Sequence, residues 1–155
     1  MTFSAPYRFL PTMATVARWF VGTVFLVSAL GKVVDPAAFA SNVAAYRLIP
    51  FGAVNVFSLM LAWTELLVGL SLLNGVAYRS AALLSAAMNI VFIIAVASAM
   101  ARGLSIECGC FTLAKSTAGW SLIARDVVLL ALSVFLTLAP SPKCGRSPAP
   151  RLEGA

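Results

Sequence analysis

Four apolar runs, each close to the length needed to cross a bilayer, occupy most of this 155-residue chain. They cover roughly residues 13–30, 53–73, 80–100 and 120–139. Water is absent from the bilayer core, so each run must satisfy its own backbone amide and carbonyl groups by forming a helix. The sequence therefore predicts an all-α fold, an integral membrane four-helix bundle.

The composition supports a membrane protein and argues against a nucleic-acid-binding one. The chain is 61% hydrophobic and only 10% charged, whereas soluble domains average about 25% charged residues. Its net charge is +6, but the lysines and arginines stand singly near the ends of apolar runs, where they orient helices. No basic cluster of the kind that binds nucleic acid is present. The lipid bilayer is the expected partner.

The segments outside the four runs divide the chain into one domain and a tail. Residues 1–139 are predicted to form the membrane domain, and the proline-rich residues 140–155 a disordered tail. Between the first two runs, residues 35–52 have helical propensity and end at Ile49-Pro50. We expect a short interfacial helix here, with Phe39, Val43 and Tyr46 on the face that lies on the bilayer.

The first run has an alternative interpretation as a secretory signal peptide. Basic residues precede its apolar stretch, and Ala38-Phe39-Ala40 has the pattern of a cleavage site. Lys32, Asp35 and Pro36 are unusual just before such a site, so we favour a membrane span.

Charged residues inside the apolar runs must be paired or functional. Glu65 lies near the middle of the second run, where a carboxylate is costly without a partner. At 1.5 Å per residue, the depths of Arg18 and Glu65 differ by roughly 5 Å, which is within the reach of an arginine. We therefore expect Arg18 to neutralise Glu65.

Asp126, in the fourth run, follows Arg125 and can pair with Arg125, Lys32 or Arg102. These charges have two interpretations. They are ion pairs that fix the packing of the helices, or they line a polar pocket that binds a ligand or passes protons.

Glu107-Cys108-Gly109-Cys110-Phe111 occupies the polar segment between the last two runs. Two thiols one residue apart can form a disulfide or resolve a mixed disulfide with a partner, and Gly109 permits the tight turn that this needs. Cys108 and Cys110 are therefore candidate catalytic residues of a thiol-disulfide oxidoreductase. The alternatives are a structural disulfide or two small residues in a loop.

The chain has no histidine, which excludes several kinds of site. Histidine-ligated haem, c-type haem attachment and a Ser-His-Asp triad all require it. Two thiolates do not complete a zinc site, so no metal is expected. The third cysteine, Cys144, lies in the tail.

Several residues together resemble a family of small membrane proteins. The first segment is similar to DoxX-type proteins, and Glu65 with Gly69 resembles their second segment. The pattern Cys108-Gly109-Cys110-Phe111, followed by Trp120 and Arg125-Asp126, resembles the MauE branch, the methylamine utilisation proteins. The first-segment residues are Gly22, Phe25, Leu26, Gly31, Lys32, Phe39, Tyr46, Leu48, Ile49 and Pro50.

The resemblance implies a four-helix protein of the bacterial cytoplasmic membrane. It also implies a role in maturing methylamine dehydrogenase, a periplasmic enzyme with many disulfides. The expected partner is a periplasmic protein with disulfides or a thioredoxin-like protein. Two other roles remain open, a subunit of a quinone-linked oxidoreductase and a non-catalytic scaffold. No residue pattern demands a cofactor, and a quinone is the one candidate.

Four spans place both termini on one side of the membrane and the Cys-Gly-Cys segment on the other. Basic residues number 6 on the side of the termini and 5 on the opposite side, which weakly favours cytoplasmic termini. A periplasmic dithiol agrees with this orientation, because disulfides persist outside the reducing cytosol. The residues counted are Arg8, Arg18, Arg79, Lys143, Arg146 and Arg151 against Lys32, Arg47, Arg102, Lys115 and Arg125.

Overall fold

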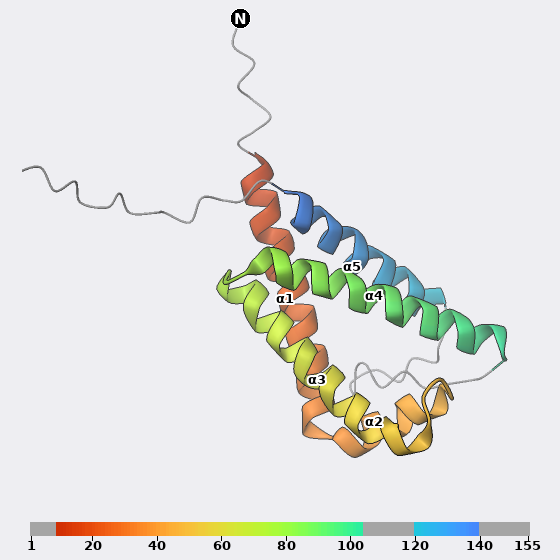
Figure 1. The fold of residues 1–155 in the computed structure, drawn as a ribbon. Helices are drawn as coiled ribbons and strands as arrows, with labels where there is room; N and C mark the ends of the chain where they lie inside the picture. The colour runs from red at the N-terminus through yellow and green to blue at the C-terminus, as the bar shows by residue number, and fades with distance from the viewer. Residues whose placement is uncertain (1–8, 104–119, 140–155) are drawn as a thin grey trace, which may run out of the picture.

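A computed structural model describes residues 9–103 and 120–139, and within them it has five helices and no strand (Figure 1). All except α2 are long and apolar enough to cross a membrane, which confirms the predicted all-α bundle with a short helix after the first span. The helices are α1 (Phe9–Val34), α2 (Pro36–Ala45), α3 (Phe51–Asn74), α4 (Tyr78–Ala101) and α5 (Trp120–Leu138). The tail from residue 140 onward lies outside the described residues, and its disorder stays a prediction.

Local sequence signals set the helix ends. Asp35 caps α2, where its Oδ1 accepts a hydrogen bond from the Ala38 amide at 2.9 Å, and Pro36 starts the helix. Gly75 closes α3 in the left-handed conformation with φ of 75°, which glycine adopts without strain. Only three residues separate α3 from α4, so the two helices must run in opposite directions.

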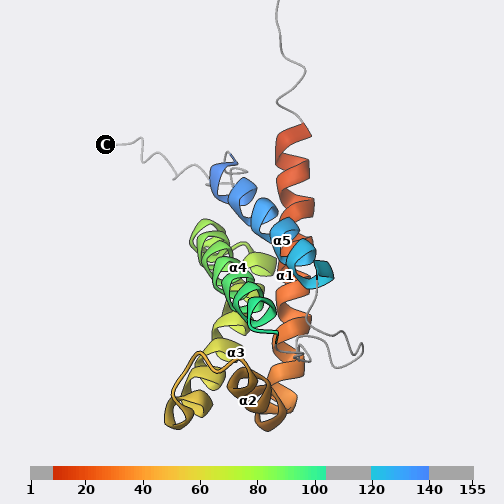
Figure 2. The same ribbon diagram turned by 90° about the vertical axis from the view of Figure 1, so that its right-hand side faces the viewer.

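The four spans form two closely packed pairs. α1 packs mainly against α3, and α4 packs mainly against α5 (Figures 1 and 2). The link between α3 and α4 and a contact of α1 with α5 join the pairs. The carboxyl end of α1, all of α2 and the amino end of α3 lie together at one end of the molecule (Figure 1).

Two glycines bring α1 and α3 into close contact. A Cβ atom at Gly69 would lie 2.9 Å from the backbone nitrogen of Leu26 and 3.1 Å from the carbonyl oxygen of Gly22. Missing side chains let membrane helices approach this closely, and dispersion contacts then replace the hydrophobic effect that lipid cannot supply. The contact also fixes the register, with Gly69 opposite residues 22–26.

Polar groups join the other helices. The Ser85 hydroxyl in α4 donates to the Ser133 hydroxyl in α5 at 2.8 Å, and both side chains are fully buried. Arg79 donates to the carbonyl of Ala139 at 3.0 Å, where the end of α5 leaves carbonyls unpaired. At the opposite end of α4, Arg102 donates to the carbonyl of Tyr46 at 2.7 Å. This bond ties α4 to the chain that follows α2.

The face of α2 that we expected on the bilayer turns inward. Phe39 is only 7% exposed, and Val43 and Tyr46 line a cavity formed with α3 and α4. That expectation was wrong because these side chains find apolar partners within the bundle. The helix also ends at Ala45, before Ile49-Pro50.

Substituting Gly69 by alanine tests the contact between α1 and α3. The new methyl group would press on the Leu26 backbone, so Gly69→Ala should lower the free energy of unfolding by about 1–3 kcal/mol. Gly52→Ala is the matched control, because a Cβ atom there meets nothing within 4 Å. The measurement is the thermal midpoint of the detergent-solubilised protein. Equal midpoints for the two variants would contradict the glycine contact.

Candidate functional site

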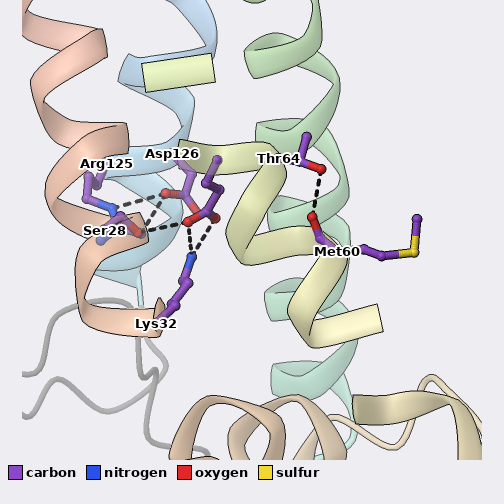
Figure 3. Close-up of polar contacts among 7 residues, drawn as sticks. Ser28, Lys32, Met60, Thr64, Arg125 and Asp126 are labelled. Atoms are coloured by element: carbon purple, nitrogen blue, oxygen red, sulfur yellow. Dashed lines mark hydrogen bonds and ion pairs between the residues drawn. The ribbon is translucent and has the colours of Figure 1, made fainter. Parts of the chain in front are cut away.

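An ion pair between Lys32 and Glu65 lies buried among the spans. Nζ of Lys32, in the last turn of α1, donates to both carboxylate oxygens of Glu65 in the middle of α3. The two residues are 1% and 2% exposed. The Ser28 hydroxyl, one turn before Lys32, donates to Glu65 at 3.4 Å (Figure 3). A charge that is removed from water needs a partner of opposite sign, and Lys32 and Glu65 provide this for each other.

Aromatic rings complete the surroundings of the lysine. Its Nζ lies 5.0 Å from the centre of the Phe39 ring in α2 and 5.1 Å from that of Phe92 in α4. An ammonium group is attracted to the negative face of such rings, more strongly when water is excluded. Lys32 therefore joins α1 to α2, α3 and α4.

A second buried carboxylate, Asp126, belongs to α5. Its Oδ1 accepts hydrogen bonds from Nε and an Nη atom of Arg125 at 3.0 and 2.9 Å (Figure 3). The carboxylate of Asp126 is buried, whereas the side chain of Arg125 is about a third exposed. The sequence analysis left Arg125, Lys32 and Arg102 as possible partners of Asp126, and in the structure the partner is Arg125.

The two ion pairs line one small cavity. A space of about 30 Å³ lies among Lys32, Glu65, Arg125, Asp126 and Asn89, with Ser28 also in its wall. This volume is about that of one water molecule. Four of the five predicted charges thus come together at membrane depth. Ser28 and Asn89 were missed from the sequence, although each is a polar residue inside an apolar run.

Arg18, the fifth predicted charge, lies elsewhere. Its guanidinium is at the carboxyl end of α3, with one nitrogen 2.1 Å from where a Cβ atom of Gly75 would be. A positive charge is favourable there because the last carbonyls of a helix carry partial negative charge. The expected Arg18–Glu65 pair was wrong.

The packing register explains this outcome. In the antiparallel pair α1 and α3, Gly69 faces residues 22–26, so Glu65, one turn earlier, faces the turn that carries Ser28 and Lys32. Arg18 then lies opposite the end of α3. The depths estimated from the sequence assumed that the ends of the two helices lie at the same height in the membrane. The close contact at Gly69 sets a different register.

A larger cavity adjoins the charges. It encloses about 230 Å³ between α2, α3, α4 and residues 46–49, and Phe92 and Asp126 belong to the walls of both cavities. Aromatic and aliphatic side chains form nearly all of its lining, with Asn42 and Asp126 as the polar exceptions. The space has the apolar walls and few polar groups typical of a small-molecule site.

Cys108 and Cys110 lie outside the described residues. The structure does place the two helix ends between which their segment runs, Ala101 of α4 and Trp120 of α5. The bond from Arg102 to Tyr46 holds the first of these ends beside the chain after α2. The end of α4 therefore lies close to the larger cavity.

Comparison with known proteins now decides the family. The family model of the methylamine utilisation protein MauE matches residues 10–139, which include every described helix except the first residue of α1. This chain belongs to the MauE family. MauE proteins of three species are similar to it over most of their length. That of Methylophilus methylotrophus is 32% identical over 133 residues, which are 84% of this chain and 70% of the relative.

MauE of Paracoccus denitrificans is 32% identical over 134 residues, covering 85% of this chain and 72% of the relative. The protein of the same name from Methylorubrum extorquens is 31% identical over 139 residues, covering 87% and 75%. No solved structure matches the chain. The family places this membrane protein among the methylamine utilisation proteins, whereas the wider DoxX-like resemblance stays a prediction.

Breaking the buried ion pair should be costly. Lys32→Met leaves the Glu65 carboxylate without its cation, so we expect a loss of about 3–5 kcal/mol in the free energy of unfolding. The double variant Lys32→Met/Glu65→Met removes both charges and should recover most of that loss. Thermal midpoints in detergent and the amount of protein in membranes are the measurements.

Arg18→Met is the control for this cycle. Its guanidinium lies at Gly75, so its effect should be the same with Glu65 present or replaced. A double variant as unstable as Lys32→Met alone would contradict the Lys32–Glu65 pair. Coupling between Arg18 and Glu65 would instead support the pairing expected from the sequence.

Proposed function

We propose that this protein is an accessory factor of methylamine utilisation that exchanges disulfides with a periplasmic partner. The observation that carries the proposal is the pair Cys108 and Cys110, one residue apart between two membrane spans of a MauE-family chain. The partner is a periplasmic protein with disulfides or a thioredoxin-like protein. This chemistry makes the protein a thiol-disulfide oxidoreductase.

The exchange requires both sulfurs. A thiolate of the partner attacks the Cys108–Cys110 disulfide, which forms a mixed disulfide and releases the other cysteine as a thiolate. The second thiolate of the partner then attacks the mixed disulfide. The partner leaves oxidised, and Cys108 and Cys110 remain as a dithiol that must be reoxidised.

The proposed location is the bacterial cytoplasmic membrane, with both termini in the cytoplasm. The count of basic residues favours this orientation weakly. The chemistry favours it more strongly, because a disulfide donor must work where disulfides persist.

Trapping of a mixed disulfide tests the exchange. In Cys108→Ser or Cys110→Ser the remaining thiolate can still attack a disulfide of the partner, which is the reverse of the second step, but no second cysteine of this chain is left to release the mixed disulfide. One of the two variants should therefore accumulate a covalent complex with the partner, and the double variant should accumulate none. Cys144→Ser is the matched control and should behave like wild type. Cells are treated with a thiol-blocking reagent and analysed on non-reducing gels. If both single variants mature the partner normally and trap nothing, the exchange is ruled out and a scaffold role replaces it.

Labelling of intact cells tests the orientation. After mild reduction, a membrane-impermeant maleimide should react with Cys108 and Cys110 and leave Cys144 unlabelled. Single-cysteine variants identify which position reacts, and permeabilised cells provide the control in which Cys144 also labels. Labelling of Cys144 alone in intact cells would invert the orientation and remove the periplasmic exchange.

A further inference from the structure

Part of the wall of the larger cavity belongs to the outer surface of the spans. Phe57 and Val91 line it and are 40% and 55% exposed on the outer surface of α3 and α4, which faces the bilayer. A volume of about 230 Å³ is several times that of one water molecule, so the space accommodates a ring-sized compound. A compound dissolved in the bilayer therefore meets part of the wall of this cavity.

The lining favours a flat compound with polar edges. Phe39, Tyr46, Phe57 and Phe92 contribute aromatic rings, against which another ring can stack. Asn42 offers an amide, which both donates and accepts hydrogen bonds, and Asp126 offers a carboxyl group. A lipid acyl chain would offer the Asn42 amide no hydrogen-bonding partner, which costs free energy.

The cavity also lies beside the helix end from which the cysteine segment departs. Ala95 and Val96 of α4 line it, two turns before Arg102. Arg102 in turn holds the backbone of Tyr46, another residue of its wall.

We propose that this cavity binds a membrane quinone, which reoxidises the Cys108/Cys110 dithiol. The two thiols lose two protons and two electrons as the S–S bond forms, and the quinone takes up two electrons and two protons to become a quinol. The electron transfer rests on the proposed function, whereas the binding of quinone does not. In this proposal the Asn42 amide donates a hydrogen bond to a ring oxygen of the quinone, and Asp126 borders the same space.

Binding of ubiquinone-1 to the purified full-length protein tests the site. We expect saturable binding of one molecule per chain, measured by calorimetry in detergent. Ala95→Trp fills the cavity and should weaken binding at least tenfold. Ala97→Trp is the matched control, because Ala97 is exposed on the same helix outside the cavity, and it should bind like wild type.

Two further measurements do not depend on the folding of Ala95→Trp. Asn42→Leu keeps the side-chain size but loses the amide, so affinity should fall a few-fold. Photolysis of wild-type protein with an azidoquinone should label peptides of α2, α4 and residues 46–49. The site is refuted if Ala95→Trp and Ala97→Trp bind alike, if labelling spreads evenly over the exposed spans, or if no saturable binding occurs.

The Cys108→Ser/Cys110→Ser variant separates this proposal from the proposed function. It should bind ubiquinone-1 as wild type does, but under anaerobic conditions only the reduced wild-type protein should convert the quinone to quinol. Quinone binding in a protein that traps no partner would refute the disulfide exchange alone. A trapped partner in a protein that binds no quinone would refute the quinone site alone.

Discussion

The ion pair of Lys32 and Glu65 is the interaction on which the rest of the bundle depends. A carboxylate at mid-span is tolerated only with a cation beside it, and the cation here comes from the end of another helix. Since Phe39 and Phe92 cover the same ammonium group, one charge holds four helices together. Helices that share a lipid-like exterior gain specificity from such a contact, because apolar side chains pack with many partners almost equally well.

The small residues decide where these charges meet. Gly22 and Gly69 let α1 and α3 touch, and this contact sets the register that brings Glu65 to Ser28 and Lys32. On the other pair, Ser85 and Ser133 provide the buried bond between α4 and α5. Close contact and polar pairing thus replace the hydrophobic effect as the source of helix association in the membrane.

The buried charges and the larger cavity are neighbours. Phe92 and Asp126 border both spaces, so a compound in the cavity would lie next to the ion pairs. The same region adjoins the end of α4, after which the cysteine pair follows in the chain. The redox chemistry that we propose for the two thiols moves protons as well as electrons, and the Asp126 carboxylate borders the cavity proposed for the quinone.

The sequence by itself determined the spans, the short helix after the first span and the family. Length and hydropathy suffice for the spans, because the bilayer forces every apolar run of such length to become a helix. The family follows from residue patterns, above all Cys108-Gly109-Cys110-Phe111. The sequence also identified Lys32, Glu65, Arg125 and Asp126 as residues that need an explanation. A charged side chain inside an apolar run is costly in lipid whatever the fold, so the residue type alone shows that it needs a partner or a function.

Only the tertiary structure decided the partners. From the depths of Arg18 and Glu65 along straight helices, the sequence analysis predicted that these two residues pair. It also predicted that Phe39 faces the bilayer. Both expectations failed for one reason. Which faces meet depends on the close contact at Gly22 and Gly69 and on the packing of α2 against α3. Register and cavities arise from the shapes of several helices together, whereas hydropathy is a property of each helix alone.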